Sequence, residues 1–449
     1  MNNPRTSHSI FHLVHNLRGG FLIRPLFIAL ALGTAGALLS AQEESHPRLS
    51  AWVPTVLFPS NRDPHTAQLI LSSIATSMMT VVSIVFAILL MTLTLASMQF
   101  SPRIIVTFIR DRITQQTLGV FLGTFLYCLA ALPAAHLLPR PFAPVLTVLG
   151  AMVLAVACVG WLLYFINHIS QAISVNNIVD TLARRTERMI DATMPDPRRG
   201  ALPPTVPADA PGPADVPLLS AVSGYVHTID APQLLRLAQA HGLTVRVSRR
   251  VGHFVPAGIP LLTVAEGQAL PPALGQQLRR AFEFGPTRTL EQDIEFGILQ
   301  IVDIALRAIS PAVNDPSTAV ACVDQLSSVL IRFAGREVPP TRFYDGAGAL
   351  RVSIPQLGFN RLAEAAFEQI RTYARTDVAV SLRLMRALAD IARTLPAGPD
   401  RRAMAEQGRR LVAGFDEAPG ENELEEMRHR LAGLEDLAGL EDVAAPAPR

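Results

Sequence analysis

The chain has 449 residues, of which 49% are hydrophobic and only 17% charged, so it is too apolar for an ordinary soluble protein. The formal net charge is +2 and no basic run suggests nucleic acid, so we expect no such partner. All 39 basic residues are arginine. Without lysine, the chain has no P-loop lysine, no Schiff-base chemistry and no lysine-borne biotin or lipoyl group.

The longest uncharged run, Thr66 to Pro102, contains 37 residues. As a helix it would be roughly 55 Å long, whereas a bilayer core is about 30 Å thick. We predict an α-helical polytopic membrane domain over residues 1–170, surrounded by lipid, with four spans near 22–42, 67–100, 117–138 and 145–166. The first span also has features of a cleaved secretory signal, but Leu39 fits the small residue before the cleavage point poorly, so a retained helix is favoured.

Arginine is richest before the first span, between the second and third spans, and after the fourth. The positive-inside rule assigns these three regions to the cytoplasm. The sequence therefore predicts a multi-pass protein of an inner (cytoplasmic) membrane with both termini in the cytoplasm.

The second span has a polar side. At about 100° per residue, six hydroxyl side chains fall within an arc of about 140°; they are Ser72, Ser73, Thr76, Ser77, Thr80 and Ser83. Small hydroxyl residues allow helices to approach closely and to hydrogen-bond across the contact. This interpretation is favoured and predicts that the face contacts protein, not lipid. The alternative is a water-exposed pathway lined by the hydroxyls.

Beyond the spans we predict a helical stalk over 171–194, a proline-rich linker over 195–217 and a small β unit over 218–268. An α-helical cytoplasmic domain over 269–415 and a charged helix with an Ala/Pro tail over 416–449 complete the chain. Helices are expected near 288–309, 316–334, 360–374, 378–395, 400–413 and 421–436.

Two glycine-opened strand segments, which begin at Gly224 and Gly252, resemble the barrel-sandwich hybrid of lipoyl and biotinyl carriers and membrane-fusion adaptors. The resemblance implies a small β fold, but the carrier lysine is missing, so we expect no cofactor. The three cysteines form no CxxC pair, and neither a disulfide framework nor a zinc site is indicated.

The densest group of polar residues lies in the predicted helical domain and forms a candidate site: Glu291, Asp293, Glu295, Asp303, Arg307, Asn314 and Asp315. Glu291 and Glu295 would share a helical face four residues apart. Acids in a first helical turn interact favourably with the helix dipole, which is the favoured explanation over a cation or arginine partner. Asp303 and Arg307 are spaced as an ion pair, and Asn314 or Asp315 is expected to cap the helix that Pro316 opens.

Four blocks carry a resemblance to a family: Gln99 to Arg103, Gly119 to Phe125, the β unit around Gly224 and Gly252, and Glu291 to Thr318. At these residues the chain resembles the bacterial predicted membrane proteins grouped as domain of unknown function 2254. Ile294 stands where the family pattern would have proline. The family has no established activity, so the resemblance implies an architecture and no catalytic residue.

No enzyme signature is visible, and the spans contain no acidic pair typical of proton-coupled pumps. We therefore predict no catalytic residue, no metal site and no enzyme activity. The favoured function is a membrane scaffold or sensor, self-associating as a homo-oligomer, whose cytoplasmic domain binds a protein or small ligand. The alternative is an oligomeric channel-like pore, lined by the hydroxyl face of the second span and gated by the cytoplasmic part.

Overall fold

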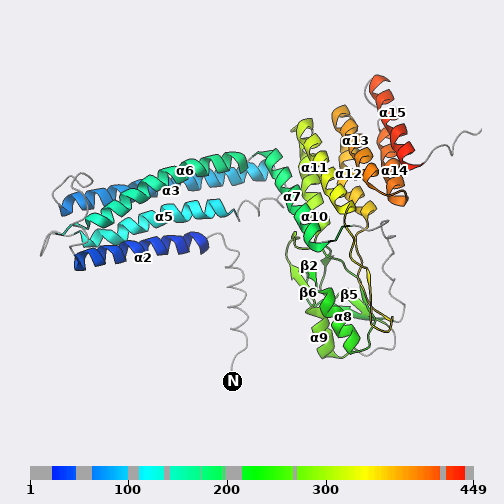
Figure 1. The fold of residues 1–449 in the computed structure, drawn as a ribbon, viewed down its shortest axis with the longest axis horizontal. Helices are drawn as coiled ribbons and strands as arrows, with labels where there is room; N and C mark the ends of the chain where they lie inside the picture. Colours follow the sequence, from blue (N-terminus) through cyan, green and yellow to red (C-terminus); the bar gives the residue numbers. More distant parts are fainter. Residues whose placement is uncertain are drawn as a thin grey trace, which may run out of the picture. The chain divides into compact units, whose positions relative to one another are not determined.

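The computed structural model describes residues 23–46, 63–99, 111–135, 142–172, 174–194, 196–197, 215–265, 270–414 and 421–439. The chain divides into two compact units, residues 1–174 and 175–449 (Figure 1). Most of the Gln99 to Arg103 block and most of the proline-rich linker lie outside the described residues.

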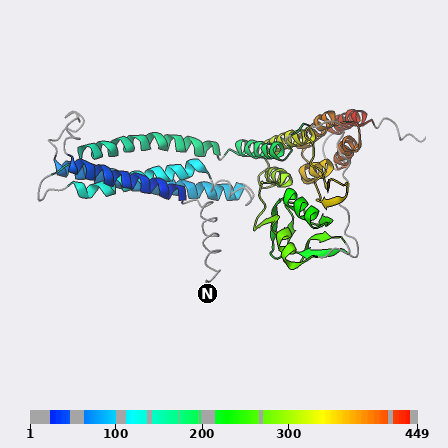
Figure 2. The same cartoon turned by 60° about the horizontal axis from the view of Figure 1, so that its bottom comes forward.

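The first unit consists of four long apolar helices that lie side by side (Figures 1 and 2). They are α2 (Ile23–Ser45), α3 (Pro64–Gln99), α5 (Arg112–Ala131) and α6 (Val145–Ala172). Each is long and apolar enough to cross a membrane, which confirms the prediction of four candidate spans. The third helix ends before the predicted position 138, because Pro133 lies in a short 3-10 turn, Leu132–Ala134, that follows it.

The tightest helix pair in this unit is α2 with α5. Glycines lie at their contact, so the two backbones approach each other without side chains between them. A Cβ atom at Gly36 would lie 2.6 Å from the carbonyl oxygen of Tyr127, and one at Gly119 would lie 3.0 Å from the Cα of Pro25. Gly123 faces Leu32 in the same way. These contacts give the Gly119 to Phe125 block a physical role in close helix packing.

Polar contacts at the helix ends fix the antiparallel order of the bundle. Both carboxylate oxygens of Glu43, near the end of α2, accept backbone N–H groups at the start of α6, from Leu146 at 2.8 Å and Thr147 at 3.1 Å. At the opposite end, Asp111 before α5 lies 3.0 Å from His168 near the end of α6. The predicted first span, near 22–42, ends before Glu43. The helix instead continues to Ser45, because this carboxylate is fully buried as a cap.

The second unit begins with α7 (Val175–Thr193), which covers the predicted stalk. Its apolar face is buried against α10 (Ile294–Ala308) and α11 (Pro316–Ala334). At Gly297 of α10 a Cβ atom would overlap the Thr186 side chain, so these two helices approach closely. The segment is therefore an integral helix of the second unit and not a separate stalk.

Two small sheets adjoin these helices. A five-stranded sheet has the order β1-β5-β3-β8-β7, and a three-stranded sheet has the order β4-β2-β6. Among the described strand pairs, β3 and β8 are parallel and the others are antiparallel. The strands are β1 (Val216–Leu219), β2 (Gly224–Ile229), β3 (Val245–Val247), β4 (Phe254–Val255), β5 (Pro260–Val264), β6 (Phe282–Gly285), β7 (Arg342–Tyr344) and β8 (Leu350–Ser353).

The sheets share one hydrophobic core with two short helices, α8 (Ala231–Ala240) and α9 (Pro272–Arg279). Leu234, Leu261, Leu262 and Leu278 are the largest fully buried side chains of this core among the described residues. Three strands, β6, β7 and β8, lie outside the interval 218–268 predicted for the β unit. The segment that resembles a barrel-sandwich hybrid is thus one part of a larger mixed α/β unit, and the barrel-sandwich fold itself is not confirmed.

The remaining helices are α12 (Phe359–Tyr373), α13 (Val378–Thr394), α14 (Pro399–Ala413) and α15 (Glu421–Ala438). Together with α11 they lie within two residues of the predicted helices. The exception is α10, which begins at Ile294 and not near residue 288, because Asp293 caps it by accepting a hydrogen bond from the Phe296 amide.

Candidate functional site

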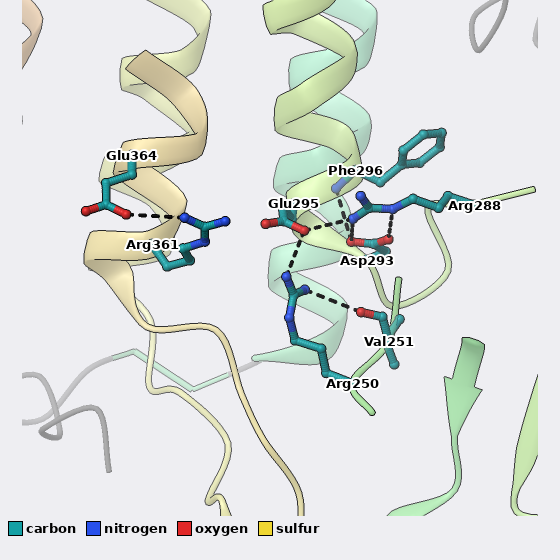
Figure 3. Close-up of polar contacts among 8 residues, drawn as sticks. All are labelled: Arg250, Val251, Arg288, Asp293, Glu295, Phe296, Arg361 and Glu364. Carbon is teal, nitrogen blue, oxygen red and sulfur yellow. Dashed lines mark hydrogen bonds and ion pairs between the residues drawn. The ribbon is translucent and has the colours of Figure 1, made fainter. Parts of the chain in front are cut away.

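Four charged side chains meet where the sheets adjoin the start of α10 (Figure 3). Arg250 comes from the loop between β3 and β4, and Arg288 from the segment after β6. Asp293 is the N-cap of α10 and Glu295 lies in its first turn. We call Arg250, Arg288, Asp293 and Glu295 the arginine–carboxylate network.

The network is closed by charge-assisted hydrogen bonds. Arg288 grips Asp293 with two of them, Nε to Oδ2 at 2.7 Å and Nη2 to Oδ1 at 2.8 Å. Arg288 Nη2 and Arg250 Nη2 also both donate to Glu295 Oε2, each at 3.0 Å. The Arg288 guanidinium carbon lies 5.4 Å from the centre of the Phe296 ring, a cation–π contact. Two positive and two negative groups therefore compensate one another.

The network is largely removed from water. The side chain of Asp293 is 2% exposed, that of Glu295 is 9% exposed, and both arginines are 16% exposed. Burial by itself would raise the pKa of Glu295, but Arg250 and Arg288 outweigh it and hold that pKa below its usual value. Glu295 is consequently a carboxylate at neutral pH.

Backbone geometry next to the network leaves room for it. Gly252 has a φ of +84°, a left-handed conformation that favours glycine. A Cβ atom there would overlap the carboxylate of Asp293 and approach Arg288. A glycine at this position thus allows the left-handed turn and leaves space for the side chains of Asp293 and Arg288.

The structure brings together only two of the predicted site residues, Asp293 and Glu295. Glu291 precedes α10, so the expected helical face shared with Glu295 does not exist. The sequence favoured the helix dipole as the explanation for the acids at Glu291 and Glu295, with an arginine partner as the alternative. In the structure Glu295 is held mainly by Arg250 and Arg288, as in the alternative. Arg250 and Arg288 were missed, because the contact between Arg250 and Glu295 joins residues 45 positions apart. The expected pair of Asp303 with Arg307 stays a prediction.

The turn after α10 is explained by capping. Asp315 accepts hydrogen bonds from the Thr318 amide at 3.1 Å and the Thr318 hydroxyl at 2.6 Å, and Pro316 opens α11. These bonds, led by that of the Thr318 hydroxyl, lower the pKa of Asp315. Asn314 has a φ of 48°, a conformation that asparagine tolerates better than most residues. The predicted cap is therefore confirmed and is assigned to Asp315.

We expect Asp315→Ala to lower the free energy of unfolding of the second unit by about 0.5–2 kcal/mol, because the amide and the hydroxyl of Thr318 both lose their acceptor. Asp315→Asn keeps a capping oxygen and is expected to be nearly silent. Labelling of the buried Cys322 of α11 by a thiol reagent in increasing urea measures this. Equal labelling curves for the alanine variant and the unsubstituted protein would contradict the cap.

Most of the hydroxyl face of α3 is not covered by the parts of the bundle that the structure describes. Ser73, Thr76, Ser77, Thr80 and Ser83 are exposed, and Ser72 is half-buried. Four of the six donate to carbonyls of their own helix, such as Thr80 to Thr76 at 3.1 Å. The opposite side of α3 packs inward through Leu71, Ala75, Met78 and Val85. Among the described residues no helix covers this face, and its predicted contact with protein stays a prediction.

These features define a polytopic membrane protein, and among the described residues the helices long and apolar enough to cross a membrane all lie in its first unit. The family model described as predicted membrane protein, domain of unknown function 2254, matches residues 18–390, and the chain belongs to this family. An uncharacterized protein of Mycobacterium bovis is 34% identical over 407 residues, covering 88% of this chain and 76% of that protein. An uncharacterized protein of Mycobacterium tuberculosis shows the same identity and coverage. No solved structure matches the chain.

Proposed function

We propose that the protein is a membrane scaffold or sensor without catalytic activity, whose second unit binds a partner or small ligand. The arginine–carboxylate network carries this proposal. Its acids and arginines are paired with one another, so they neither offer a free base nor leave an open position for a substrate. Instead they couple the turn at Arg250 and the segment at Arg288 to the first turn of α10. Such a coupling suits a unit that transmits a binding event from sheet to helices.

The second unit is proposed to lie in the cytoplasm of the cell, with the four helices in the inner membrane. The arginine distribution around the spans supports this orientation. The antiparallel bundle agrees with it, since Glu43 and the start of α6 share one end and Asp111 and His168 share the other.

Self-association is proposed to occur through the hydroxyl face of α3. A face of exposed small hydroxyl residues on a membrane helix suits close contact with a second helix. Because the chain's own helices leave this face uncovered, a second copy would provide the contact. The same exposure supports the second candidate function, a pore formed by several copies, in which water would reach the hydroxyls.

Cysteines introduced by Ser73→Cys, Ser77→Cys and Thr80→Cys separate these arrangements. The native Cys128, Cys158 and Cys322 are buried, so they give little background. If copies pack dry, we expect disulfide cross-links between chains and no labelling by a water-soluble thiol reagent. Labelling by that reagent would favour the pore, and labelling by a lipid-soluble reagent alone would contradict both.

The proposed cytoplasmic location of the second unit is tested in intact spheroplasts. A cysteine introduced at the exposed Gly346 should react with a water-soluble thiol reagent only after the membrane is permeabilised.

A further inference from the structure

A hollow of about 800 Å³ lies between α7 and the end of α11, within the second unit. It is separate from the arginine–carboxylate network and has the size of a small-molecule site. Its charged lining consists of Arg184, Glu187, Arg188, Asp191, Arg332 and Arg336. Four arginines against two carboxylates leave a charge of +2.

The arginines of α11 are held at one side of the hollow. Asp191 accepts from Arg332 Nε at 2.8 Å and Nη2 at 2.6 Å, and from Arg336 Nη2 at 2.6 Å. The hydrogen bond from Arg332 is the main reason that the pKa of Asp191 lies below its usual value. Ser328 donates to Glu187 at 2.7 Å and ties α11 to α7 again. The two helices therefore present their arginines in a fixed frame.

The arginines of α7 are less fully compensated. Arg184 pairs with Asp180 one turn earlier, and Arg188 donates through Nε to the Arg184 carbonyl at 3.2 Å. Among the described residues, no carboxylate lies within ion-pair distance of the Arg188 guanidinium. Arg184 thus has Asp180 as its counter-ion, whereas the charge of Arg188 is left uncompensated next to a second guanidinium one turn away.

We propose that the hollow binds an anion that carries at least one phosphate group. A guanidinium presents a planar set of donors that matches phosphate oxygens, and the ligand's charge would offset the positive charge that Arg188 leaves on the lining. The helix dipole accounts for Arg332 and Arg336 at the end of α11, but it does not account for Arg184 and Arg188. The ligand is either a soluble phosphate compound or the head group of an anionic phospholipid. This inference rests on the ligand-binding role proposed above.

The test uses the full-length protein with Ser328→Cys, which places a thiol at an exposed position of the lining. Labelling of that thiol is measured in detergent with and without inorganic pyrophosphate. It is also measured in nanodiscs of phosphatidylglycerol or of phosphatidylcholine alone. Protection by pyrophosphate indicates a soluble ligand, whereas protection in phosphatidylglycerol alone indicates a lipid head group; either result supports the site.

Arg188→Gln is expected to weaken this protection about tenfold, the effect of losing one charge-assisted hydrogen bond. Arg185→Gln is the matched control, because Arg185 is exposed on the same helix and does not line the hollow. The proposal is overturned if neither anion protects the thiol, or if both variants weaken protection equally. Either failure leaves the scaffold or sensor role intact, since that role is tested separately by ion conduction.

Discussion

Arg288→Met is expected to lower the free energy of unfolding of the second unit by about 3–5 kcal/mol, the range found when one partner of a buried ion pair is removed. Asp293 would keep its hydrogen bond from the Phe296 amide but lose both hydrogen bonds from the guanidinium. Its side chain is only 2% exposed, so water could not replace the lost donors. Glu295 would keep only Arg250. The urea dependence of Cys322 labelling measures the change, because burial raises the pKa of this thiol to about 12 and keeps it unreactive while α11 is folded.

Arg361→Met is the matched control. Arg361 pairs with Glu364 on the surface of α12 at 3.4 Å, with side chains 63% and 45% exposed, so its loss should change stability little (Figure 3). Equal stability of the two variants would show that the network does not hold the unit together.

Acid should remove the contribution of Glu295 in a defined direction. Its pKa is lowered in the folded protein, so the stabilisation is fully present above the unfolded pKa of about 4.3. It is lost as the pH falls through the lower folded value. The stability difference between the unsubstituted protein and Glu295→Gln should therefore shrink below about pH 4.

The second large effect is expected in the bundle, where Gly36→Ala should separate α2 from α5. The new methyl would lie 2.6 Å from the Tyr127 carbonyl oxygen and 3.1 Å from its Cα. Backbone atoms cannot rotate away, so overpacking is expected to cost about 1–3 kcal/mol. This exceeds the gain of about 1 kcal/mol in helix propensity from glycine to alanine.

Gly160→Ala in α6 controls for that propensity, because a Cβ atom there meets nothing within 4 Å. Thermal labelling of Cys128, which is buried in α5 beside Tyr127, reports the opening of the helix pair. Earlier labelling in Gly36→Ala than in Gly160→Ala is expected. The same labelling temperature for both would contradict close packing through Gly36.

The elements that sequence predicted well are those set by local signals. Asp315 followed by proline placed the start of α11, and uncharged runs placed the four long helices. Predictions failed where a distant residue decides. Glu43 extends α2 because it caps α6, about 100 residues away, and β8 completes a sheet by pairing with β3. No periodicity in the sequence records such contacts.

The candidate site shows the same division. The acids at Asp293 and Glu295 were visible as a local cluster. Arg250 lies 45 positions from Glu295, so nothing local distinguished it among 39 arginines. Arg288 lies only five positions before Asp293, but it was expected at the start of a helix near residue 288 and not in a segment that folds back onto that acid. The hydroxyl face of α3 was correctly seen as one-sided, but a single sequence could not tell whether the chain itself or another copy covers it.

The central claim, a scaffold or sensor that conducts no ions, is tested most directly by electrical recording from the purified full-length protein in planar bilayers. The account predicts no current above that of a protein-free membrane, at any ratio of protein to lipid. Discrete current steps that disappear in the Ser73→Leu variant would contradict it and establish the pore.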